Sequence, residues 1–113
     1  MSTLTRDAAQ LLETCRTADQ YATSYADHAL QAAKDSHQWD AKMHAQNAAQ
    51  WALSAAGWAE QAADSAAEAA ARFPSRVETE ECARFARYAR ASAAAAARSA
   101  AECWTAYAAE LSA

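Results

Sequence analysis

Glycine and proline are almost missing from this chain, which has one of each among its 113 residues. Tight turns depend on these two residues more than on any others, so a fold built from many short strands is excluded. Cysteine occurs three times without any Cys-x-x-Cys spacing, which excludes a disulfide framework and a zinc site of that type. The length suits one domain with one core, and we expect residues 1–113 to form it.

The sequence also lacks the motifs that carry familiar chemistry. It has no glycine-rich phosphate loop, no Gly-x-Ser-x-Gly and no His-Glu-x-x-His. The N-terminus has no apolar signal core, and the longest alanine run is too short and too weakly apolar to span a membrane. A net charge of −4 argues against nucleic acid as the main partner. We therefore expect a cytoplasmic protein that is not an enzyme, uses no cofactor and binds neither nucleic acid nor membrane.

Alanine is what the chain has in abundance, with 38 residues. Alanine favours helix because it loses no side-chain entropy on ordering. Pro74 cannot continue a helix, and Ser75 with Glu78 has the spacing of a capping box that begins the next one. This punctuation predicts a helix on each side of Pro74.

An earlier break contains neither glycine nor proline and is indicated only by the phase of the pattern. From Leu4 to Ala32, small and apolar residues recur at alternating steps of three and four. The same register, continued further, meets the most polar line of the next segment. One straight helix cannot turn both lines toward a core, so we expect a turn at residues 35–37, with Asp35 or Ser36 as the N-cap.

The predicted fold class is therefore all-α: an antiparallel up-down-up bundle of three long helices at about 3–34, 38–73 and 76–112. Lines of alanine let helix backbones approach closely, so we expect close-packed alanine seams. Trp51 and Trp58 lie on one shoulder of the second seam, and Leu53 lies on the other. The three cysteines, on the seams themselves, act as small apolar residues. The predicted lines are Leu4, Ala8, Leu11, Cys15, Ala18, Ala22, Tyr25, Ala29 and Ala32; then Ala45, Ala48, Ala52, Ala55, Ala59, Ala62, Ala66, Ala69 and Phe73; then Cys82, Ala86, Ala89, Ala93, Ala96, Ala100, Cys103, Tyr107 and Leu111.

Three side chains near the start of the second helix are candidate metal ligands. His37, Asp40 and His44 have i, i+3, i+7 spacing, so we expect them to share one helical face. The alternative is a polar first turn, in which Asp40 interacts with the helix dipole.

Basic and aromatic residues alternate in the third helix, where Arg84, Arg87 and Arg90 enclose Phe85 and Tyr88. Such interleaving is used to bind single-stranded nucleic acid. The alternative is a solvated face with helix-surface ion pairs, because glutamates stand four residues from two of the arginines, in Glu80–Arg84 and Arg98–Glu102. The helix carries equal numbers of arginine and glutamate, which favours the solvated face.

Trp39 and Met43 are large apolar residues on the line that is otherwise polar in the second helix. They either form a contact site for a partner or pack locally under the first turn. With Trp51 and Trp58, they are the predicted partner interface.

A core made mostly of methyl groups buries little surface for a domain of this size. We therefore expect a non-enzymatic scaffold or protein-interaction module that self-associates, most simply as a homodimer. The alanine- and tryptophan-rich composition resembles that of helical bacterial immunity proteins, which implies, as an alternative, a small protein that neutralises a partner protein. That resemblance covers no motif and assigns no residue. A metal- or ligand-binding bundle is the third possibility.

Overall fold

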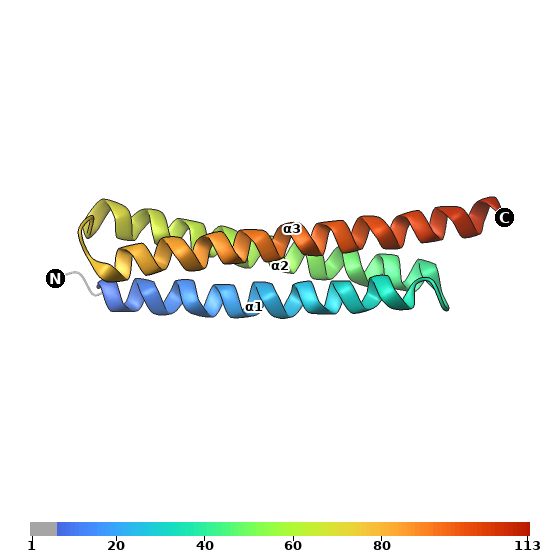
Figure 1. The fold of residues 1–113 in the computed structure, drawn as a ribbon, viewed down its shortest axis with the longest axis horizontal. Helices are drawn as coiled ribbons and strands as arrows, with labels where there is room; N and C mark the ends of the chain where they lie inside the picture. The colour runs from blue at the N-terminus through green and yellow to red at the C-terminus, as the bar shows by residue number, and fades with distance from the viewer. Residues whose placement is uncertain (1–6) are drawn as a thin grey trace.

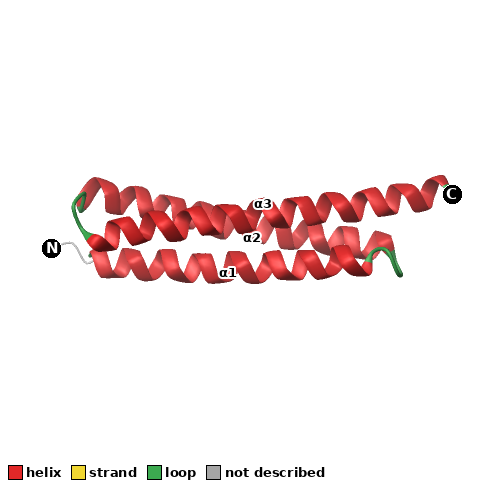
Figure 2. Ribbon diagram, in the orientation of Figure 1, coloured by secondary structure: helices red, strands yellow, loops and turns green. Residues whose placement is uncertain are grey.

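The computed structural model describes residues 7–113, and its regular structure is three long helices: α1 (Ala8–Asp35), α2 (Ala41–Arg72) and α3 (Val77–Ser112). Figure 2 shows helices joined by two short loops. Every helix packs against both others, so the predicted all-α three-helix bundle is confirmed. The expected start near residue 3, and Leu4 with it, lie outside the described residues.

The helices alternate in direction along an elongated molecule of 62 × 24 × 16 Å. The colours in Figure 1 run one way along α1, back along α2 and forward again along α3. The packing agrees, because Cys15 near the start of α1 donates a hydrogen bond to the carbonyl of Ala62 near the end of α2, with Sγ···O of 3.5 Å. Thr23 and Ser92 join α1 to α3 through hydroxyl groups 3.0 Å apart.

The first helix has a cap that the pattern did not indicate. The carboxylate of Asp7 accepts a hydrogen bond from the backbone N–H of Gln10, and the Gln10 side chain accepts one from the backbone N–H of Asp7. This reciprocal capping box satisfies two backbone donors that a helix start leaves unpaired.

The predicted break between the first two helices is confirmed, but its predicted cap is wrong. Ser36 is the C-cap of α1, and α2 begins only at Ala41. Asp40 is the N-cap of α2, with its Oδ1 accepting a hydrogen bond from the Met43 backbone N–H at 3.1 Å. Its backbone is left-handed, with φ of 44°. Aspartate tolerates that region better than most residues, so the chain can turn here without glycine.

The capping box expected after Pro74 is not formed. Arg76 is the N-cap of α3 and makes no side-chain capping hydrogen bond. Thr79 holds this connection instead, because its hydroxyl donates to the carbonyl oxygen of Phe73, the C-cap of α2. The carbonyl oxygen of Ala69 also lies 3.4 Å from that hydroxyl. The stop at Pro74 was predicted correctly, while the start of α3 depends on a contact between two helices.

The buried core consists almost entirely of alanine and cysteine. Leu11 is the only large aliphatic side chain among the fully buried residues that the structure describes. Most residues of the three predicted lines are buried or partly buried. Leu111 is a correction, because 68% of it is exposed. Figure 1 shows the reason: α3 continues past the turn that joins α1 to α2, so its last turns extend beyond both neighbouring helices.

Candidate interaction surface

Aromatic side chains of α1 and α2 pack against each other along the groove between these two helices. Trp58 of α2 stacks on Tyr21 of α1, with ring centroids 4.7 Å apart, and Trp51 stacks on Tyr25 at 5.7 Å. The His28 ring meets Trp51 edge-on at 5.0 Å. Two of the tryptophans predicted for a partner interface therefore already pack within the molecule, and each is partly buried.

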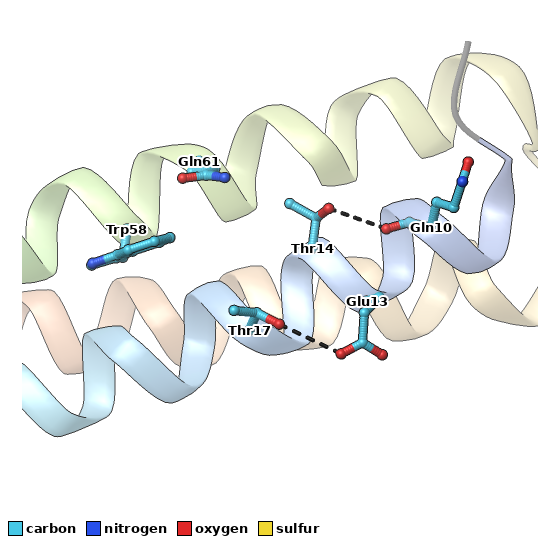
Figure 3. Close-up of a pocket in the computed structure, with 6 residues that line it drawn as sticks. All are labelled: Gln10, Glu13, Thr14, Thr17, Trp58 and Gln61. Atoms are coloured by element: carbon cyan, nitrogen blue, oxygen red, sulfur yellow. Dashed lines mark hydrogen bonds between the residues drawn. The ribbon is translucent and has the colours of Figure 1, made fainter. Parts of the chain in front are cut away.

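A pocket of about 400 Å³ opens beside Trp58 in the same groove (Figure 3). Its other lining side chains are polar, and two hydrogen bonds among them join residues of α1. Thr14 donates to the carbonyl of Gln10 at 3.1 Å, and the Thr17 hydroxyl lies 3.5 Å from an oxygen of Glu13. Both bonds join residues i and i+4 of one helix, so neither brings groups from different helices together to position a substrate.

The groove between α2 and α3 is different. It has a volume of about 570 Å³, and every residue that lines it is apolar: Ala49, Ala52, Leu53, Ala56, Ala97, Ala100, Ala101 and Trp104. Leu53 is 74% exposed and Trp104 is 44% exposed. We call this surface the α2–α3 groove. It has the features of a binding surface: exposed apolar side chains, one of them tryptophan, beside a floor of small residues.

An exposed line on α3 extends this surface in both directions. Residues seven apart share a helix face, and such steps connect Arg90, Ala97, Trp104 and Leu111. All four are exposed. The α2–α3 groove is thus continued on α3 by apolar Leu111 toward the C-terminal end and by basic Arg90 toward the other end.

Trp39 and Met43 lie at the turn between α1 and α2. Trp39 precedes the helix rather than lying on its polar face, as had been expected, because α2 begins at Ala41. Its ring meets that of His44 edge-on at 4.4 Å, although 55% of Trp39 remains exposed. Met43 is partly buried. The local packing foreseen as one alternative is present, and Trp39 still offers half of its surface to a partner.

The three candidate metal ligands do not share a helical face, since His37 lies in the turn and Asp40 caps α2. His37 is exposed, with Nε2 4.0 Å from a carboxylate oxygen of Glu102. His44 is buried beneath Trp39, and its Nε2 has no hydrogen-bond partner among the described residues. Across residues 7–113, no three histidine, cysteine or acidic side chains lie close enough together to hold a metal ion.

The arginines of α3 point to solvent, and Phe85 does not. Arg84, Arg87 and Arg90 are exposed, whereas Phe85 is partly buried with the Arg16 guanidinium 5.6 Å from its ring centroid. The expected pairs of Glu80 with Arg84 and of Arg98 with Glu102 are not formed in the part of the chain that is described. The aromatic and basic groups therefore form no continuous stacking surface.

The sequence interpretation missed the partnership of Leu53 with Trp104. One signal for this pairing was available, because the periodicity places Leu53 on the shoulder of α2 opposite Trp51 and Trp58. A second signal was the line of residues spaced seven apart that passes through Ala97 and Trp104. Neither pattern indicates which neighbouring helix each shoulder faces.

Comparison with known proteins finds no family model, no curated protein and no solved structure that matches this chain. Within residues 7–113, none of the helices combines the length and the apolar character that crossing a bilayer requires.

Proposed function

We propose that this protein is a non-enzymatic helical-bundle interaction module of the cytoplasm, and that it self-associates through the α2–α3 groove. The observation that carries the proposal is the groove's wholly apolar lining, with Leu53 and Trp104 exposed on it. Burial of one leucine side chain contributes about 1.5–3 kcal/mol. A symmetric interface would gain that contribution twice, because one patch serves both subunits.

A second copy of the chain suits this surface because the line on α3 is complementary to itself. Ala97 lies midway between Arg90 and Trp104, seven residues from each. A two-fold axis near Ala97 therefore brings Trp104 of one copy opposite Arg90 of the other. A guanidinium over an indole face contributes about 0.5–1 kcal/mol at an exposed site. The alanines around the axis leave room for close approach of the two α3 helices.

Sedimentation equilibrium over a concentration series tests the proposal. The native protein should reach twice the chain mass of 12.1 kDa. Leu53→Asp should remain at the monomer mass, because it places a charge in the centre of the interface. Leu30→Asp is the matched control: Leu30 is an exposed leucine on α1, outside the groove, and its variant should still dimerise.

A native protein that is monomeric at every concentration would overturn the self-association. A dimer that survives Leu53→Asp but dissociates with Trp39→Ala would place the interface at the turn between α1 and α2. Dissociation by Leu30→Asp as well would show that the effect of Leu53→Asp is not specific to the groove.

A further inference from the structure

Two of the three cysteines are neighbours across the bundle. Cys15 of α1 and Cys82 of α3 are fully buried in one cluster with Leu11 and Ala69, at the end of the molecule that holds the α2–α3 turn. The Cys15 thiol lies close enough to that of Cys82 to influence its pKa. The residues lie 67 positions apart in the sequence, so only the folded chain holds them together.

Cys103 provides an internal comparison. It is also fully buried on α3, but it belongs to the cluster at the other half of the bundle. The side chain that influences its pKa is Ser36, whose hydroxyl donates to the carbonyl of Ala33, so it has a hydroxyl nearby where Cys82 has a thiol. The two α3 cysteines thus share burial and helix, and differ in the group that faces them.

We propose that Cys15 and Cys82 are a redox-active pair, which forms an intramolecular disulfide in the presence of a small disulfide oxidant such as oxidised glutathione. This inference does not depend on self-association. Disulfides require Cα atoms about 4.4–6.8 Å apart. Around the two cysteines the core is made mostly of alanine and cysteine, the small side chains that allow helix backbones to approach closely.

The exchange proceeds in two steps that balance. The thiolate of one cysteine attacks a sulfur of oxidised glutathione, forms a mixed disulfide and releases one glutathione thiolate. The second cysteine, as thiolate, attacks the protein sulfur of that mixed disulfide and releases the other glutathione. The two protein thiols lose two protons and two electrons in total, and one molecule of oxidised glutathione becomes two of reduced glutathione.

The surroundings make this pair slow to react rather than unable to react. Burial raises the pKa of the Cys82 thiol, the neighbouring Cys15 thiol opposes that rise, and the carboxylates of Glu81 and Glu78 add to it. Little thiolate is therefore present at neutral pH. Cys82 lies near the start of α3 and Cys15 near the start of α1. Helix ends open more often than helix centres, which gives the oxidant access.

The experiment is incubation of the folded native protein in glutathione buffers of increasing oxidised fraction, followed by acid quench and mass spectrometry. Two of the three thiols should be lost, and the mass should fall by two hydrogen atoms. Tryptic digestion should join the peptide ending at Arg16 to the peptide ending at Arg84. Cys103→Ala, at an equally buried position, should behave in the same way, whereas Cys15→Ala and Cys82→Ala should form no internal disulfide.

A reaction in denaturant gives the reference for chance pairing. The unfolded chain should favour Cys82 with Cys103, which are only 21 residues apart, because the shorter loop loses less entropy. The folded protein should not form that bond. Cross-links that contain Cys103, only mixed disulfides with glutathione, or no oxidation of the folded native protein would each overturn the proposal.

Discussion

The two grooves that flank α2 lie between similar helices, but they differ in how far their large side chains are covered. On the α1 side, Trp51 and Trp58 stack on two tyrosines and cover the alanines beneath. On the α3 side, Leu53 and Trp104 stand exposed above a floor of alanine. An alanine seam brings helices together but fills little of the space beside it. Large side chains on the shoulders must do so. Trp51 and Trp58 stack on tyrosines of α1, whereas Leu53 lies beside Trp104 of α3 and both of these stay exposed.

Because the two grooves differ, residues that stabilise the monomer should be distinguishable from residues that bind a second copy. Aromatic residues of the α1–α2 groove stack on one another within the monomer, so their removal should reduce the stability of the fold. The residues of the α2–α3 groove have little to contact in the monomer, so their removal should affect binding. Both grooves hold tryptophan, which allows the two roles to be compared in the same residue type.

Replacement of tryptophan in the two grooves should give the largest contrast. Trp58→Ala should lower the free energy of unfolding by about 2–4 kcal/mol, somewhat less than for a fully buried tryptophan. Trp104→Ala should lower it by less than about 1 kcal/mol, because 44% of the residue is exposed. Urea unfolding in a Leu53→Asp background measures both without a contribution from dimerisation. Equal losses would mean that the two grooves do not differ in this way.

Neighbouring alanines of α2 test the seam itself. Ala55 is fully buried, whereas Ala56 is exposed and lines the α2–α3 groove. Ala55→Leu should destabilise the protein by about 1–3 kcal/mol, because close packing leaves no room for added carbons. Ala56→Leu should change stability by less than about 0.5 kcal/mol. A higher melting temperature for Ala55→Leu would show that the core is under-filled.

The connections at the two ends of α2 also differ, because only one of them supplies a side-chain cap to the helix that follows. Asp40 caps α2 on the α1 side, while Arg76 begins α3 without a side-chain capping bond. Asp40→Ala should cost about 1 kcal/mol through the lost cap. Arg76→Asp should stabilise by about 0.5 kcal/mol, since a carboxylate can cap the helix and interact with its dipole. Thermal unfolding measures both, and a loss of stability in Arg76→Asp would show that Arg76 contributes through its contact with Phe73, at 5.7 Å.

Much of the fold could be predicted because its causes are local. Alanine favours helix wherever it stands, Pro74 stops a helix whatever surrounds it, and the change of phase near residue 35 requires a turn. The positions of the caps were less predictable. Ser75 and Glu78 have the spacing of a capping box, yet Thr79 contacts the end of α2 instead, and such a contact exists only after the helices have packed.

The candidate site was predicted less well than the fold. Periodicity placed Trp51 and Trp58 on one shoulder of α2 and Leu53 on the other. It did not indicate that the tryptophans would meet tyrosines of α1, or that Leu53 would lie beside Trp104 of α3. Nor did it indicate that Cys15 and Cys82 would be neighbours.

By itself the sequence determined three helices, their breaks and the line that each one buries, because helix propensity and the 3.6-residue period act between residues near in the chain. The tertiary structure alone decided which shoulder each neighbouring helix would cover. Three helices joined by short loops can close in either of two hands, and the buried lines are nearly the same in both. The choice depends on how the shoulder side chains pack between helices. That packing placed the aromatic shoulder of α2 against α1 and left the shoulder of Leu53 uncovered beside α3.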